Sequence, residues 1–314
     1  MLFDGWSVAA KGDEPLNNPW KGHPFNAANN INSIDGDTDH DGNGLEVQTL
    51  GNGDVTALQD AYVRKVIDAV GDLDNVLYEI DNEGDPSSKT WQYHMIQVIR
   101  DYEAMKGKQH PVGMTPMWPT GPDADLTASG ADWIATTGNL EVPSNANGAQ
   151  VLFSDTDHLC GICGSVGWVW KSFTKGQNPI LMDGYDGLAV GLGSEDYSST
   201  DAIWETLRKN MGSARSYAQR MDLALAIPHG DKVLEYNGTT AQTGYCLARP
   251  GSYYLVFLPG GGNVTLDLSE VGGSLSVEWF NPTTGAMTPA APVPGGPART
   301  LTAPFGGDAV LFLH

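Results

Sequence analysis

A polar cluster ends an otherwise apolar stretch between residues 75 and 84. The stretch reads NVLYEIDNEG, so Glu79, Asp81, Asn82 and Glu83 follow residues that are typical of a buried strand. Like charges packed at one strand end repel each other and are poorly solvated, so a purely structural strand gains nothing from them. A carboxylic acid beside an amide can instead transfer a proton and hydrogen-bond a polar substrate. The sequence therefore predicts catalytic chemistry at Asn82 and Glu83.

A regular alternation of strand and helix patterns surrounds this cluster. We expect six strands, within residues 1–8, 75–80, 110–118, 132–137, 149–158 and 178–187. We expect four helices, within residues 55–73, 90–105, 167–176 and 200–224. Such alternation predicts parallel β/α units. In a β/α barrel the carboxyl ends of the strands form the catalytic face, and a closed barrel has eight strands.

The residues that end the later strands supply a partner for Glu83. Hydrolysis of a glycosidic bond needs a second carboxylate facing the first across the scissile bond. Asp155 ends the strand that comes third after the Glu83 strand, and Asp157 follows it closely. Asp155 has an alternative role as the cap of a following helix. Asp157 and Asp183 therefore remain open as the second carboxylate.

Further polar and aromatic side chains at strand ends are candidates for binding a sugar. We expect substrate contacts from Asn82, Trp118, Asp157, His158, Asp183 and Tyr185. An amide or carboxylate binds sugar hydroxyls, and an indole provides a flat apolar face for a sugar ring. Asp186 offers a further carboxylate beside Tyr185. Core packing is the expected role of Trp6, Trp20 and Trp170.

The pattern changes after residue 224. Short alternating strands separated by Gly, Pro and Asn turns continue to the C-terminus, with no helical pattern between them. This pattern is typical of an antiparallel β-sandwich. We therefore expect a barrel domain over residues 1–224 and a small sandwich domain over residues 225–314.

Composition limits the partners of the protein. The 314 residues contain 38 acidic and 17 basic side chains, for a net charge of −21. This charge repels nucleic acid and anionic membrane surfaces, which leaves neutral polar substrates. No apolar run is long enough to span a bilayer, and no secretory signal opens the chain. The pair Cys160 and Cys163 lacks a thioredoxin-like context, so we expect two small residues near a helix start.

An acidic loop raises the question of a metal ion. Asp37, Asp39 and Asp41, followed by Gly42, match the start of a calcium-binding loop with oxygen ligands at alternate positions. Gln48 stands where the twelfth-position Glu is expected. The sequence therefore predicts a solvated acidic loop that binds Ca²⁺ at best weakly. No metal and no cofactor are expected.

The quoted segments also carry a family resemblance. VLYEIDNEG resembles the acid/base strand of the retaining (β/α)8 glycoside hydrolase clan. NPWKGHPFNAANNIN, SDTDHLCGICG, WVWKSFTKGQNPILMDGYDG and SYYLVFLPGGG with WFNPTTG resemble bacterial hydrolase-like proteins that join such a barrel to a C-terminal collagen-binding β-sandwich. The resemblance implies that Glu83 is the acid/base and Asn82 its neighbouring hydroxyl ligand. It puts Asp155 where the clan has a Glu nucleophile, and it implies a secreted or periplasmic location.

Together these observations predict an incomplete (β/α) TIM-type barrel, starting at its third strand, followed by a small antiparallel β-sandwich. The expected function is that of a β-glycosidase with Glu83 and Asp155 as its carboxylate pair. The alternative is a non-catalytic carbohydrate- or matrix-binding protein on a degenerate barrel. Because an incomplete barrel leaves strand edges open, we also expect a homo-oligomer or a rearranged N-terminal segment that covers them.

Overall fold

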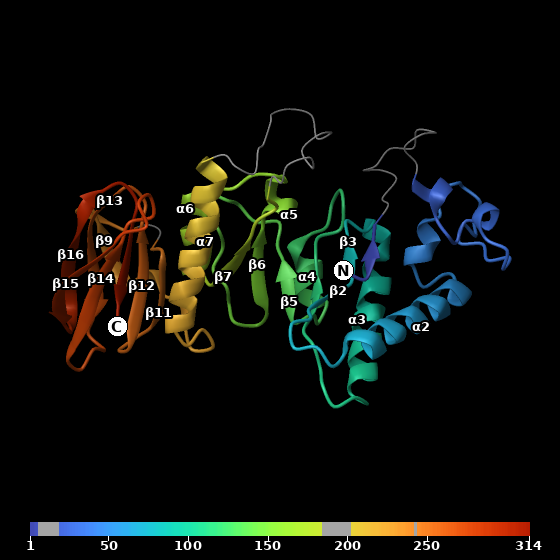
Figure 1. Cartoon of the computed structure of the whole chain (residues 1–314), viewed down its shortest axis with the longest axis horizontal. Coiled ribbons are helices and arrows are strands. Elements are labelled where there is room, and N and C mark those ends of the chain that lie inside the picture. The colour runs from blue at the N-terminus through green and yellow to red at the C-terminus, as the bar shows by residue number, and fades with distance from the viewer. Residues whose placement is uncertain (6–18, 184–201, 242–243) are drawn as a thin grey trace. The chain divides into compact units, whose positions relative to one another are not determined.

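The computed structural model describes residues 1–5, 19–183, 202–241 and 244–314 (Figure 1). The chain forms two compact units, residues 1–137 and residues 138–314. The division lies within the β/α part of the chain rather than at its C-terminal end.

Parallel strands form the centre of the first unit. Strand β1 (Phe3–Asp4) pairs with β3 (Asp81–Asn82). Strand β2 (Tyr78–Glu79) pairs with β4 (Val112–Met114), which in turn pairs with β5 (Trp133–Ala135). Within the strand expected over residues 75–80, β2 covers Tyr78 and Glu79, and β3 follows it with a different neighbour. Glu83 comes directly after β3, at its carboxyl end.

The described residues of the first unit form the α-helices α2 (Gly53–Val70), α3 (Lys89–Glu103) and α4 (Asp123–Ala128). The Asn52 side chain caps α2 by accepting a hydrogen bond from the N–H of Val55. The helix buries apolar and amide side chains at three- and four-residue spacing, namely Val55, Gln59, Val63 and Ile67. Helix α4 was not expected from the sequence. Short 3₁₀ helices complete the unit, η1 (Pro19–Gly22), η2 (Ala27–Asn29), η3 (Leu45–Gln48) and η4 (Pro86–Ser88).

The second unit begins with one more parallel pair. Strand β6 (Val151–Asp155) pairs with β7 (Gln177–Ile180). Helices α5 (Thr156–Cys160) and α6 (Val166–Thr174) connect them, and α7 (Ala202–Arg220) follows.

Antiparallel strands complete the described part of the second unit. They are β8 (Ile227–Pro228), β9 (Val233–Tyr236), β10 (Thr239–Thr240), β11 (Cys246–Arg249), β12 (Tyr253–Leu258), β13 (Gly261–Leu268), β14 (Ser274–Phe280), β15 (Met287–Pro294), β16 (Gly296–Gly306) and β17 (Ala309–Leu313), with the 3₁₀ helix η5 (Gly230–Lys232). One sheet has the order β10-β9-β13-β16, and the other has the order β15-β14-β17-β12-β11-β8. Apolar side chains of both sheets, including Tyr254 and Trp279, form the core between them.

The six-stranded sheet of the sandwich is apolar on both faces. Along β12, Tyr254 and Val256 point into the sandwich core, whereas Leu255 and Phe257 pack with residues of α6 and α7. These helices lie beside that sheet (Figure 1). Burial on both faces explains why β12 reads as a continuous apolar run instead of alternating. The sandwich therefore shares a core with the last two helices, and its independence as a domain over residues 225–314 stays a prediction.

The pair Cys160 and Cys163 forms a disulfide, so the interpretation as two unpaired small residues is wrong. Helix α5 ends at Cys160, and Gly161 turns the chain with a positive φ of 74°. The turn leaves the two Cα atoms 6.0 Å apart, which is within reach of a disulfide. Cys246 is free and buried in the sandwich.

The described residues thus confirm the predicted fold class of parallel β/α units followed by an antiparallel sandwich. Within the described part of the chain, no helix combines the length and the apolar character that a membrane span requires. Self-association that covers open strand edges stays a prediction.

A buried ion pair joins the last residue of α3, Glu103, to His110 in the first unit. The side chains of His110 and Glu103 are 3% and 2% exposed, and His110 Nδ1 lies 2.7 Å from Glu103 Oε1. His110 Nε2 lies 2.9 Å from the carbonyl oxygen of Leu73, which can only accept. A protonated ring satisfies both contacts, because each ring nitrogen then donates to an oxygen. The hydrogen bond to Glu103 raises the pKa of His110 above 6.5, against the opposing effect of burial.

We predict that Glu103→Ala lowers the free energy of unfolding at pH 6 by about 3–5 kcal/mol, because the buried imidazolium loses its carboxylate. Urea denaturation measures the change. Arg100→Gln is the control, because the ion pair of Arg100 with Asp132 is exposed and its loss should change stability little.

The same pair sets a pH dependence. Because the folded-state pKa of His110 is raised, its contribution is complete below about pH 6.5 and is lost as pH rises through the folded-state value. The wild type should therefore lose stability above that value, and Glu103→Ala should lose less. Equal pH dependence in the two proteins would contradict the assignment.

Candidate functional site

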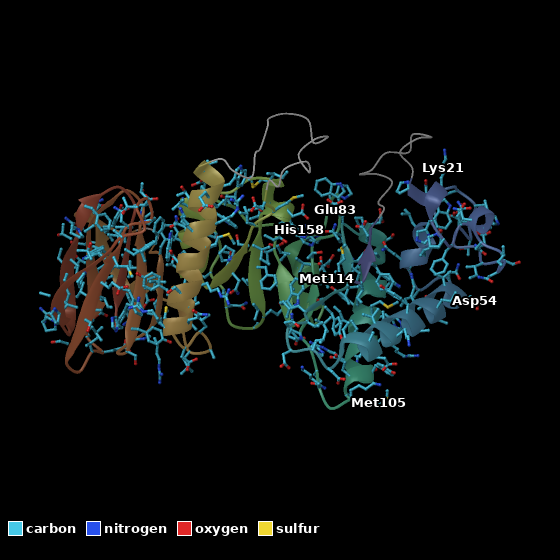
Figure 2. All side chains as sticks on the ribbon, in the orientation of Figure 1. Lys21, Asp54, Glu83, Met105, Met114 and His158 are labelled. Atoms are coloured by element: carbon cyan, nitrogen blue, oxygen red, sulfur yellow. A yellow bond between two sulfur atoms is a disulfide. The ribbon has the colours of Figure 1, made fainter. Side chains whose placement is uncertain are left out.

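The polar cluster predicted from the sequence lies at the carboxyl end of β3 (Figure 2). Asn82 and Glu83 are half-buried there. Glu83 adopts a left-handed backbone conformation with φ of 51°, which is uncommon for a residue other than Gly, Asn or Asp. The neighbouring chain packs closely, since the Gly5 N–H donates to Asn82 O at 2.6 Å. A Cβ atom at Gly5 would lie 2.2 Å from Glu83 O, so only glycine fits.

A buried hydrogen-bond network around Asp81 fixes the position of this strand end. Asp81 is 1% exposed, and its Oδ1 accepts a hydrogen bond from Gln48 Nε2 at 2.9 Å. Thr115 Oγ1 lies 2.9 Å from Asp81 O and 3.0 Å from Glu79 Oε1. A Cβ atom at Gly84 would lie 2.1 Å from Asp81 Oδ2, so this position also needs glycine. Asp81 and Glu79 therefore support the strand end.

Trp118 is the aromatic candidate beside this strand end. Its backbone N–H donates to Gly84 O at 2.9 Å, and its side chain is 48% exposed. A cis peptide bond joins it to Pro119. The other seven tryptophans in the described part of the chain are buried, namely Trp20, Trp91, Trp133, Trp168, Trp170, Trp204 and Trp279. Trp118 thus offers an open indole face, whereas Trp20 and Trp170 are core residues and Trp6 lies outside the described residues.

Asp155 occupies the carboxyl end of β6 in the second unit. Its Oδ1 accepts a hydrogen bond from the Asp157 N–H at 3.0 Å, so the side chain caps α5. Its Oδ2 lies 3.9 Å from His158 Nε2, and the two side chains are 19% and 8% exposed. Burial raises the pKa of the Asp155 carboxyl, while the Asp157 N–H and His158 oppose the rise. The helix-cap role is therefore real, and it leaves the second oxygen facing His158.

Asp183 has a strong partner that the sequence did not indicate. Arg208 donates to both carboxylate oxygens of Asp183, from Nε at 2.6 Å and from Nη2 at 3.0 Å. Arg208 lies within α7, where no local sequence signal distinguishes it from a surface arginine. The paired guanidinium neutralises Asp183, which makes Asp183 a weaker nucleophile candidate than Asp155. Tyr185 and Asp186 lie outside the described residues.

The candidate residues therefore form two groups. The first unit contains Asn82, Glu83 and Trp118. The second unit contains Asp155, Asp157, His158 and Asp183. Each group stands at the carboxyl ends of parallel strands, which is where β/α enzymes carry their catalytic residues.

The C-terminal strands match a known family. Residues 227–314 match the family described as "Putative collagen-binding domain of a collagenase". This match confirms the predicted resemblance of the C-terminal region. Among curated proteins, none matches the chain.

Two solved structures share the fold of most of the chain. One is a glycoside hydrolase family 5 protein from Bacteroides vulgatus ATCC 8482, with 13% identity and a TM-score of 0.57 over 82% of this chain and 66% of that chain. The other, named only as a glycoside hydrolase, has 12% identity and a TM-score of 0.52 over 83% of this chain and 68% of that chain. The chain thus spans about two thirds of their lengths. With these structures it shares a fold of parallel β/α units followed by a C-terminal β-sandwich.

We predict that Asp155→Asn stabilises the folded protein at pH 7 by a few tenths to about 1 kcal/mol. Because the folded-state pKa of Asp155 is raised, the ionised carboxylate opposes folding above that value, and the neutral amide avoids this cost. The Asn oxygen can still accept from the Asp157 N–H, so the cap is kept. Thermal unfolding at pH 7 measures the shift.

Asp155→Ala is the matched control, since it removes the charge and the cap together and should be less stable than Asp155→Asn. A lower melting temperature for Asp155→Asn than for the wild type at pH 7 would contradict the burial argument.

Proposed function

We propose that the protein is a β-glycosidase that cleaves O-glycosidic bonds with two carboxylates in a retaining mechanism. The observation that carries this proposal is the backbone of Glu83. A left-handed glutamate at the end of a parallel strand costs about 1–3 kcal/mol, and such strain is concentrated at functional sites. The half-buried carboxyl beside Asn82 and the open indole of Trp118 fit a sugar-binding acid.

In the proposed mechanism Glu83 acts first as an acid. It donates its proton to the glycosidic oxygen while the Asp155 carboxylate attacks the anomeric carbon, and the bond to the leaving group breaks. Glu83, now ionised, then takes a proton from water. The water oxygen attacks the anomeric carbon and releases Asp155 as a carboxylate, so protons and charges balance over the two steps. Asn82 donates to the neighbouring sugar hydroxyl, and Trp118 stacks on a ring.

The side chains and backbone around Asp155 make it the preferred nucleophile. The Asp157 N–H fixes one oxygen of Asp155, and His158 lies against the other. Asp157 and His158 then act by positioning Asp155. Asp183 is held by Arg208, and we assign it to hydroxyl binding beside Tyr185.

A second candidate function is non-catalytic binding of carbohydrate or matrix protein. The match of residues 227–314 to a family named for collagen binding favours it. Under this alternative the sandwich supplies the affinity and Glu83 has no chemical role. Turnover of aryl glycosides separates the two candidates.

We predict that Glu83→Gln lowers kcat/KM by about 10²–10⁴ on unactivated glycosides, because the amide cannot protonate a poor leaving group. The loss should be smaller on nitrophenyl glycosides, whose leaving groups need little protonation. A panel of nitrophenyl and alkyl glycosides measures both values. Added azide should restore part of the Glu83→Gln rate, because it attacks the intermediate without base assistance.

Glu79→Gln is the matched control. Its Oε1 lies 3.0 Å from Thr115 Oγ1, and a Gln oxygen can take the same place, so the change should leave the dependence on the leaving group unchanged. An equal rate loss for Glu83→Gln on all leaving groups would contradict the acid role. Absence of turnover in the wild type on the whole panel would favour the binding function.

A further inference from the structure

Three carboxylates of the acidic loop converge in the first unit. One carboxylate oxygen from each of Asp37, Asp39 and Glu46 lies within 4.8 Å of the other two. Oxygens bound to one Ca²⁺ ion at about 2.3–2.6 Å are at most about 5 Å apart. The three side chains are therefore spaced as ligands of a single ion.

One oxygen of Glu46 is independent evidence for a missing partner. Glu46 Oε2 is closed off from solvent, and no hydrogen-bond donor in the described part of the chain reaches it. Glu46 as a whole is half-buried, and Asp37 beside it is 9% exposed. A carboxylate oxygen that is closed off from solvent is costly when no donor reaches it, and a bound cation removes that cost.

The charges around Glu46 have one sign. Burial raises the pKa of Glu46 most, its own backbone N–H opposes the rise, and the charges of Asp39, Asp41 and Asp37 add to it. Among the residues that the structure describes, no lysine or arginine forms an ion pair with these four carboxylates. The negative electrostatic potential at the loop therefore favours binding of a cation.

The loop is held in place by a small apolar core. Trp20, Val47 and Val55 form that core, and the loop glycines pack on it. A Cβ atom would lie 2.8 Å from the Trp20 ring at Gly36 and 2.3 Å from it at Gly44. Asp37 also accepts hydrogen bonds from the N–H groups of Asp41 and Gly42, at 3.1 and 3.0 Å. Asp37 is thus held in position by the fold, whereas Asp39 is exposed and accepts a hydrogen bond from the Asp41 N–H at 3.1 Å.

Sequence counting selected a different residue for the last ligand position. Gln48 stands twelve positions along the motif, but its Nε2 donates to Asp81 Oδ1 and it belongs to the support of the strand end. Glu46, two residues earlier on η3, is the residue that faces Asp37 and Asp39. The expectation of weak binding depended on Gln48, and the structure removes that reason.

We propose that Asp37, Asp39 and Glu46 bind one Ca²⁺ ion. Three carboxylates without nitrogen or sulfur ligands select a hard cation, and Ca²⁺ accepts the irregular ligand geometry of a loop more readily than Mg²⁺ does. Water and backbone carbonyl groups complete the coordination. Because Glu46 and Gln48 share η3, the ion also fixes the helix that holds Asp81 beneath Asn82 and Glu83.

Calorimetric titration of the whole chain with Ca²⁺ in 150 mM KCl tests the site, together with thermal melts in Ca²⁺ and in EGTA. We expect one strong site and a melting temperature that is higher in Ca²⁺. Glu46→Gln keeps the shape of the side chain and should weaken binding about tenfold or more, with most of the melting shift lost. Asp54→Asn removes one exposed charge from the first turn of α2 and should bind like the wild type.

Four results would overturn the proposal. They are no saturable Ca²⁺ binding, wild-type affinity in Glu46→Gln, an equal loss of affinity in Asp54→Asn, and tighter binding of Mg²⁺ than of Ca²⁺. The second and third would show that the net charge of the protein attracts the ion without a built site. None of these outcomes depends on glycosidase activity, so failure here and failure of the proposed function are distinguishable.

Discussion

The buried carboxylate of Asp81 is the constraint on which the strand end of the first unit depends. A charged group that is 1% exposed needs partners, and Gln48 supplies one from a distant loop, while Thr115 holds the backbone carbonyl of Asp81. The contact with Gln48 brings η3 against the strand, and the other oxygen of Asp81, Oδ2, would lie 2.1 Å from a Cβ atom at position 84, which is glycine. The backbone beyond Asp81 then has little freedom, which explains how Glu83 is kept in a left-handed conformation.

A second constraint organises the other unit. The middle strands of the six-stranded sheet carry apolar side chains on both faces. The four-stranded sheet buries one of these faces, and α6 and α7 bury the other. Trp170 and Tyr217 lie in that shared core, and Trp170 Nε1 donates to Asn210 at 2.8 Å. The face of the six-stranded sheet that packs on α6 and α7 is therefore part of the core of this unit.

Patterns with a fixed period were predictable from the sequence. The strands near Tyr78 and Val151 and the four long helices follow from apolar spacing, and the end of β3 follows from the clustered polar residues. Contacts between distant residues were not predictable. The pairing of Asp183 with Arg208, the disulfide after α5, and the facing of Glu46 rather than Gln48 toward Asp37 all depend on how the chain folds back. Periodicity reports which face is buried, and it carries no information on which side chains meet.

Covalent trapping tests the proposed carboxylate pair most directly. The protein is incubated with the 2-deoxy-2-fluoro analogue of the glycoside that it hydrolyses, and the modified peptide is sequenced by mass spectrometry. The fluorine slows both steps, so the glycosyl-enzyme intermediate of a retaining enzyme accumulates. The proposed mechanism predicts one fluoroglycosyl group on Asp155. A label on Asp157 or Asp183, or hydrolysis of the parent glycoside with no labelled peptide, would contradict it.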